Sequence, residues 1–191
     1  MSDSNKSQKK LFKNASWLFG GKSASGIFTA IQTVIVARML GVSDYGLLTL
    51  VIAYISVLNM FFDLKVWETA TKYIGTYLEK GEADKTRSMI KLSYILDIGS
   101  GIIAFIIAIL SAKLISTYII HTPDEYVLIL IFSISLFIDT ANSTSDAILR
   151  VFDRFKSIAF INSFQKLFRL LVVVGLLFAG FGIEGVLYGF I

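Results

Sequence analysis

The stretch IVARMLGVSDYG, residues 35–46, is a short polar hinge between two long apolar runs. Glycine often ends a helix in the left-handed conformation, so Gly41 predicts the end of one membrane-spanning helix. Ser43 or Asp44 suits the cap of the next helix, because both residue types accept hydrogen bonds from free backbone amides. The stretch therefore predicts two consecutive transmembrane helices joined by a tight turn.

The composition is that of an integral membrane protein. Hydrophobic residues make up 55% of the 191 positions, the mean hydropathy is +0.72 and 17% of residues are charged, whereas a soluble domain carries roughly a quarter. The absence of cysteine excludes disulfides, thiolate metal sites and cysteine nucleophiles. A net charge of +4 would suggest nucleic acid in a soluble protein, but here we expect the cations to face the membrane and expect no nucleic-acid partner.

Apolar runs of about 20 residues predict where the chain crosses a bilayer. We expect helices near 15–40, 45–66, 91–119, 125–149 and 158–181, and the start of a sixth at 183–191. Residues 1–14 predict a basic N-terminus, and 67–90 predict an amphipathic connector at the cytoplasmic interface. The predicted fold is an all-α polytopic transmembrane bundle with about five full helices and a truncated sixth.

Lysine and arginine are distributed unequally between the two sets of predicted loops. One set contains most of them: Lys6, Lys9, Lys10, Lys13, Lys65, Lys72, Lys80, Lys85, Arg87, Lys91, Arg150, Arg154 and Lys156. The other set contains only Arg38 and Lys113. By the positive-inside rule, we expect a cytoplasmic N-terminus and an outward-facing hinge at Gly41 in the cell membrane.

Several predicted helices carry a stripe of polar residues at spacings of three and four, which places them on one face. Charged groups inside a bilayer are expensive and usually line a cavity or a pathway. The candidates for such a site are Lys22 and Gln32 in the first helix, Asp97 in the third, Asp139, Asn142 and Asp146 in the fourth, and Lys166 and Arg169 in the fifth.

Two interpretations of these residues are open. At 1.5 Å per residue, the cations and Asp139 fall at roughly 10 to 16 Å from the cytoplasmic end, so they can meet at one depth. In a hydrated cavity, Lys22, Lys166 and Arg169 would neutralise an anion such as phosphate, and the carboxylates and amides would pair with them or couple to cations. Alternatively, Lys166 and Arg169 reach the headgroups, and Asp97 and Asp146 are helix-end residues in the interface.

The chain lacks the motifs of common enzymes. It has no GxxxxGK[ST] loop, no nucleophile elbow, no HExxH pair and no clustered metal ligands. We therefore expect a protein without a cofactor or a metal that is not an enzyme. A membrane-embedded transferase that uses Asp139 or Asp97 is the weaker hypothesis.

The run VARMLGVSDYG resembles the start of polysaccharide-transporter flippases in the multidrug/oligosaccharidyl-lipid/polysaccharide (MOP) superfamily. Their signature is an ARxLG helix end, a short outward turn, and YG at the start of the second helix. In this chain those positions are Arg38, Leu40, Gly41, Tyr45 and Gly46. The segments ILRVFDRFKSIAF (148–160) and FGIEGVLYG (181–189) also resemble later parts of these proteins.

The resemblance implies two six-helix lobes around a central cavity that opens alternately to each side, with most of one lobe in this chain. The implied partners are membrane lipids, a lipid-linked glycan and a C-terminal lobe. Relatives such as the lipid II flippase hold a pyrophosphate with cationic cavity residues, and Lys22 is a counterpart by location and chemistry. Arg38 at the outward end suits an orienting or gating role.

The leading hypothesis is a flippase that moves polyprenyl-pyrophosphate-linked oligosaccharide or polysaccharide units across the cytoplasmic membrane. A membrane potential or a cation gradient would drive it. A cation-coupled multidrug exporter of the same superfamily and a non-transporting scaffold for envelope assembly are the alternatives.

Overall fold

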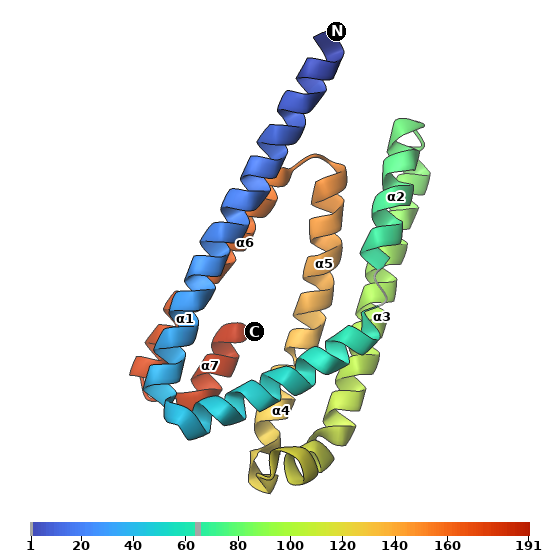
Figure 1. Ribbon diagram of the computed structural model, residues 1–191. Coiled ribbons are helices and arrows are strands. Elements are labelled where there is room, and N and C mark those ends of the chain that lie inside the picture. Colours follow the sequence, from blue (N-terminus) through green and yellow to red (C-terminus); the bar gives the residue numbers. More distant parts are fainter. Residues whose placement is uncertain (1, 64–65) are drawn as a thin grey trace.

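The computed structural model describes residues 2–63 and 66–191, and every regular element in these residues is a helix (Figure 1). The elements are α1 (Ser2–Phe62), α2 (Val66–Glu79), α3 (Ala83–Ile115), the π-helical turn η1 (Ser116–Ile120), the 3₁₀ turn η2 (Pro123–Glu125), α4 (Tyr126–Ser133), α5 (Ser135–Val151), α6 (Phe155–Phe178) and α7 (Gly182–Phe190). Four helical segments of the described chain are long and apolar enough to cross a membrane: Phe12–Phe62, Ala83–Ile120, Pro123–Val151 and Phe155–Phe178. The predicted all-α polytopic bundle is confirmed.

Helix α1 bends sharply at Gly41, which has φ 78° and ψ 177°. We call residues 12–40 the first limb and residues 42–62 the second limb; Figure 1 shows them leaving the bend at an angle. The predicted break is present, but the predicted left-handed helical conformation is wrong, because ψ is extended. A positive φ with an extended ψ is essentially confined to glycine, so the bend depends on this residue.

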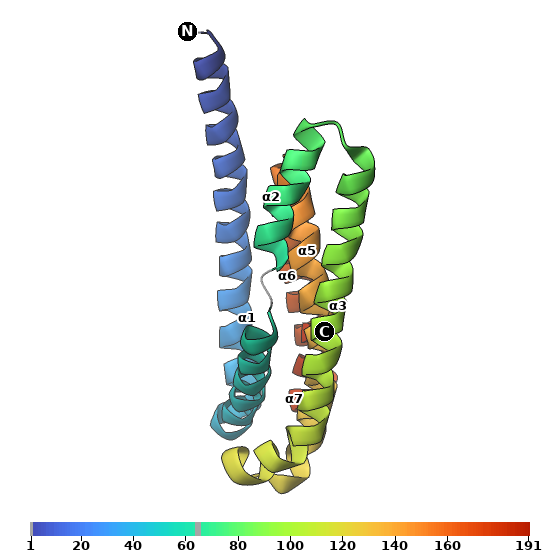
Figure 2. The same cartoon turned by 90° about the vertical axis from the view of Figure 1, so that its right-hand side faces the viewer.

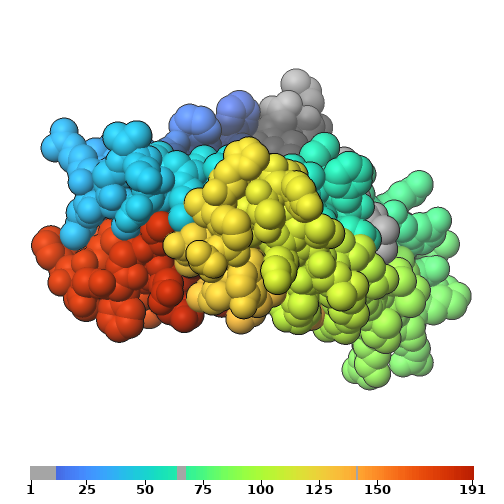
Figure 3. Space-filling model, turned by 90° about the horizontal axis from the view of Figure 1, so that it is seen from below, coloured from blue at the N-terminus to red at the C-terminus, as the bar shows by residue number. Residues whose placement is uncertain are grey.

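The turns of the chain gather at two ends of the molecule. The N-terminus, the α2–α3 turn and the α5–α6 turn lie at one end, which we call the N-terminal end (Figure 1). Gly41, the η1–η2 segment and the α6–α7 turn lie at the other, the hinge end, which Figure 3 shows face on. This is the same partition of loops from which the charge distribution predicts the orientation.

Helix α2 differs from the predicted connector. The second limb ends at Phe62 rather than near 66, and α3 begins at Ala83 rather than near 91. Between them α2 runs alongside α3 toward the N-terminal end and also packs against α5 (Figures 1 and 2). Ala70 and Ile74, one helical turn apart, are fully buried in this contact. The second limb and α2 thus follow one another from the hinge end to the N-terminal end. Burying the apolar face of α2 against α3 and α5 is more favourable than leaving it exposed at an interface.

The core combines bulky aliphatic side chains from α1 with small residues from α3. The principal members are Val36, Leu48, Val51 and Ile55 of α1, Ala104 and Ala108 of α3, Ile129 of α4, Leu136 of α5, Val173 of α6, and Val186 and Leu187 of α7. Small residues let helix backbones approach closely, which favours helix association in a membrane. Large apolar side chains such as Ile27, Ile103 and Leu171 are exposed on the outside, where a surrounding bilayer accepts them.

Candidate functional site

Helices α1 and α6 make a close contact at Gly21. A Cβ atom added at this position would lie 2.7 Å from Cβ of Ala159, so the two helices approach only because position 21 has no side chain. The Ser163 hydroxyl donates a hydrogen bond of 3.3 Å to the Gly21 carbonyl across the same contact. The contact fixes the position of the residues on either side of it.

A cavity of about 230 Å³ lies beside this contact, between α1, α6 and the end of α5. Three of its lining residues are cations, Lys22 from α1, Arg150 from α5 and Lys166 from α6. Among the described residues, none that lines this cavity is acidic. We call it the cationic cavity. Like charges around a small space repel one another, so an anion bound between them lowers the electrostatic energy.

Two uncharged polar groups complete the cationic cavity. The Asn162 amide lines it and donates a hydrogen bond of 3.3 Å to Asp146 Oδ2 on α5, which holds the amide in place. The Ser25 hydroxyl also lines it and is buried without a hydrogen-bond partner among the described residues. A buried hydroxyl that lacks a partner is costly, and an anionic oxygen would satisfy it.

The structure brings together part of the predicted cation set. Lys22 and Lys166 face the same cavity, as the depth estimate predicts. Arg169 is held elsewhere, because its guanidinium donates a hydrogen bond of 2.7 Å to the Phe190 carbonyl and lies 5.3 Å from the centre of the Phe190 ring. Asp139 interacts electrostatically with Arg169 and Lys166, but no ion pair of 4.0 Å or less joins it to either one.

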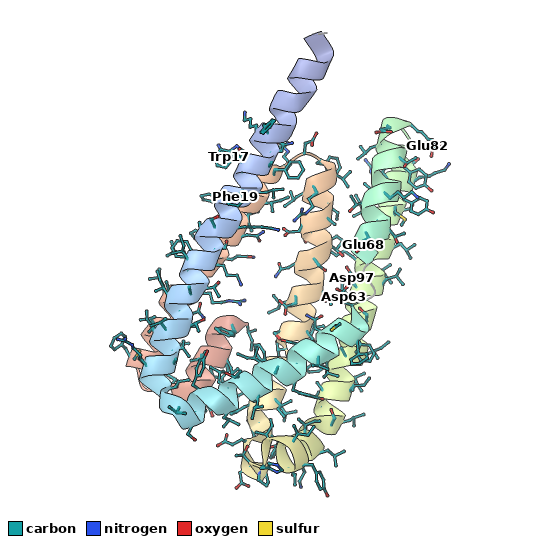
Figure 4. The ribbon with its side chains drawn as sticks, viewed as in Figure 1. Trp17, Phe19, Asp63, Glu68, Glu82 and Asp97 are labelled. Carbon is teal, nitrogen blue, oxygen red and sulfur yellow. The ribbon has the colours of Figure 1, made fainter. Side chains whose placement is uncertain are left out.

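Asp97 lies in a helix contact rather than beside the cations. Its side chain is 5% exposed, and its Oδ2 accepts a hydrogen bond from the Thr144 hydroxyl of α5. One turn further, a Cβ atom added at Gly101 would lie 3.1 Å from Oγ1 of Thr140. Asp97 therefore does not line the cationic cavity with Lys22, and its hydrogen bond joins α3 to α5. Figure 4 shows Asp97 beside Asp63, at the end of the second limb.

The remaining candidates are dispersed. Gln32 is buried and lines a second cavity of about 280 Å³ between the two limbs of α1, together with Tyr45 and Phe190. Arg38 and Gly46 are exposed, as are Asp139 and Asn142. In the part of the chain that is described, no three His, Asp or Glu residues are grouped so that they could hold a metal ion. The carboxylates predicted to couple to ions thus do not converge.

Arg150 lines the cationic cavity but is not among the site candidates that the sequence indicates. The sequence places it among the loop cations that predict the orientation. It stands four positions after Asp146, in the same stripe as Asp139 and Asn142. This spacing indicates that Arg150 lies on the polar face of its helix. The stripe on α5 thus ends in a cation that faces Lys22 and Lys166.

The chain matches a family model described as "Polysaccharide biosynthesis protein" over residues 11–190. It belongs to this family. The match confirms the family resemblance indicated by the hinge motif. Among curated proteins, this member of the polysaccharide biosynthesis protein family is similar to "Inner membrane protein YghQ" of Escherichia coli (strain K12), with 23% identity over 151 residues, which cover 79% of this chain and 42% of that protein. No solved structure matches the chain.

Membership in the polysaccharide biosynthesis protein family agrees with the four segments that are able to cross a membrane. The chain is a multi-pass membrane protein. It spans less than half the length of the curated relative that it matches.

Proposed function

We propose that the chain is part of a flippase that moves a lipid-linked oligosaccharide or polysaccharide unit across the cytoplasmic membrane by alternating access. The observation that carries this proposal is the cationic cavity, in which Lys22, Arg150 and Lys166 surround about 230 Å³. The family supports the glycan part of the substrate. The N-terminal end would face the cytoplasm, and a second lobe would supply the opposite wall of the transport pathway.

The donors of the cationic cavity suit a phosphate or pyrophosphate. Arginine forms paired hydrogen bonds with phosphate oxygens, and lysine adds point charges that need no fixed geometry. The Ser25 hydroxyl and the Asn162 amide supply neutral donors beside them. The glycan itself would remain in the pathway, since the cavity is large enough only for the anionic linkage.

A membrane potential or a cation gradient would provide the driving force. Moving one elementary charge through 100 mV is worth about 2.3 kcal/mol, which is sufficient to bias a two-state cycle. The three fixed cations would balance the charge of a bound pyrophosphate, so the loaded and the empty site would carry different net charges and the potential would act on them differently.

Neutralising one cation of the cavity tests this function. We expect Lys22→Gln, Arg150→Gln and Lys166→Gln each to lower the translocation rate about tenfold or more, because one hydrogen bond between charged groups contributes about 1.5–3 kcal/mol. The assay measures how fast lipid-linked oligosaccharide becomes accessible to an impermeant glycan-binding protein at the outer surface of cells. The matched control is Lys80→Gln, which removes the same charge from the exposed α2–α3 turn.

Three results would contradict the proposal. Translocation that is unchanged in all three cavity variants would exclude the cationic cavity as the substrate site. Resistance to organic cations that requires Asp139 and not Lys22 would indicate a drug exporter instead. Variants that abolish translocation but still support assembly of the cell envelope would indicate a scaffold.

A further inference from the structure

A third and larger cavity opens on the other side of the Gly21–Ala159 contact. It is a groove of about 720 Å³ between the first limb of α1 and the start of α6, and Gly21 and Ala159 line both it and the cationic cavity. Its volume is in the range of small-molecule sites, which is roughly 300–1,000 Å³. We call it the α1–α6 groove. The two cavities are separated by one helix contact, so an occupant of the groove lies outside the cationic cavity.

The surface of the α1–α6 groove is aromatic, with cations beside it. Trp17 and Phe160 line it and are 42% and 71% exposed. Lys13 and Lys156 also line it, and the Lys156 ammonium lies 5.5 Å from the centre of the Trp17 ring. Figure 4 shows Trp17 on α1 opposite the start of α6, toward the N-terminal end. None of its described lining residues is acidic, so neither lysine has a carboxylate partner within the groove.

This combination matches one kind of molecule. Tryptophan prefers the level of the lipid headgroups, with its ring toward the hydrocarbon. Lysines near the membrane surface attract anionic headgroups, at about 1 kcal/mol for each. A partner helix with a purely apolar face would leave both lysines without an acceptor, whereas an anionic lipid brings both an apolar chain and a phosphate.

We propose that the α1–α6 groove binds an anionic phospholipid of the surrounding membrane. The phosphate lies between Lys13 and Lys156, and one acyl chain lies against Trp17 and Phe160. The contact between Lys156 and the Trp17 ring holds the ammonium beside the headgroup position. The site is distinct from the proposed substrate site, and it does not depend on whether the protein is a flippase.

Photo-crosslinking from within the groove identifies the occupant. The protein carries p-benzoylphenylalanine in place of Phe160 and is reconstituted in nanodiscs with equal amounts of phosphatidylglycerol and phosphatidylcholine. We expect adducts with the mass of phosphatidylglycerol to exceed those of phosphatidylcholine. The matched control has the same group at Phe164, which stacks on Phe160 at 6.2 Å, is 56% exposed and does not line the groove; its adducts should follow the bulk lipid ratio.

Charge variants test the headgroup contact. Lys13→Gln and Lys156→Gln should each reduce the phosphatidylglycerol enrichment at position 160 about fivefold, in line with the contribution of one lysine near a charged surface. Lys80→Gln should leave it unchanged. An unchanged unfolding temperature in pure phosphatidylcholine nanodiscs shows that the variants fold.

Several outcomes would overturn the assignment. Equal lipid ratios at positions 160 and 164 would show that the groove has no headgroup selectivity. Crosslinks to a polypeptide would show that a protein segment covers the groove. In membranes from cells, an adduct with the mass of a polyprenyl phosphate would assign the groove to the lipid carrier instead. The translocation assay reports on the cationic cavity separately, so failure of one proposal leaves the other standing.

Discussion

Gly41 and Gly21 both lie on α1, but the structure needs glycine at these positions for different reasons. At Gly41 the requirement is conformational, since φ is 78° and ψ is 177°. At Gly21 it is spatial, because α6 occupies the place of a side chain. Gly46, also in the hinge motif, meets neither condition: a Cβ atom there would have no neighbour within 4 Å, and its backbone is helical.

The conformational requirement predicts opposite effects at the two glycines of the hinge motif. Gly41→Ala should destabilise the protein by about 1–3 kcal/mol, the cost of holding a side chain in a rarely populated backbone region. Gly46→Ala should be neutral or stabilise by up to about 1 kcal/mol, because alanine favours a helix. Denaturant titration in detergent micelles, followed by tryptophan fluorescence, measures both. Equal stability of the two variants would show that the bend does not depend on Gly41.

The hinge sequence indicated where α1 breaks but not its geometry. A glycine followed by polar residues marks a helix end, and that much was correct. Which of the several glycine conformations is adopted depends on how the second limb packs, and Leu48, Val51 and Ile55 bury that limb in the core. Such long-range packing leaves no local signal in the sequence.

The contact between α1 and α6 at Gly21 positions the cationic cavity and the α1–α6 groove. Gly21→Val should destabilise the protein by about 1–3 kcal/mol, because overpacking at a close contact forces the helices apart. The same shift should separate Lys22 from Lys166 and reduce translocation. Gly20→Val is the matched control, since a Cβ atom at position 20 has no neighbour within 4 Å. If both variants unfold at the same denaturant concentration, the close approach at Gly21 is not important for stability.

Contacts between elements determine which of the predicted site residues lie together. Counting residues along a helix gives depth, and depth places Lys22, Lys166, Arg169 and Asp139 at similar levels, of which Lys22 and Lys166 line one cavity. The neighbour on each face depends on the order of helices in the bundle, and this placed Asp97 against Thr144 and Gln32 between the limbs of α1. The amphipathic pattern of 67–90 indicates a helix, and in the structure α2 packs against α3 and α5.

For the whole molecule, composition indicates a membrane protein, because only 17% of residues are charged. Apolar runs of about 20 residues then indicate that it is helical. The orientation remains a prediction, and the absence of cysteine offers a direct test. In intact cells, an impermeant maleimide should label Val42→Cys, a site that is 93% exposed at the hinge end. It should label Lys80→Cys, on the exposed α2–α3 turn, only after permeabilisation. The reverse pattern would place the N-terminus outside.

The bend at Gly41 also has a consequence for the parity of the membrane crossings. Because the chain turns back there, the N-terminus and the α2–α3 turn lie at the same end of the molecule. A straight α1 would send residues 42–62 onward, and every later loop would exchange sides. The sidedness of each loop after residue 41, and with it the side from which the cationic cavity is reached, follows from the backbone geometry of one residue.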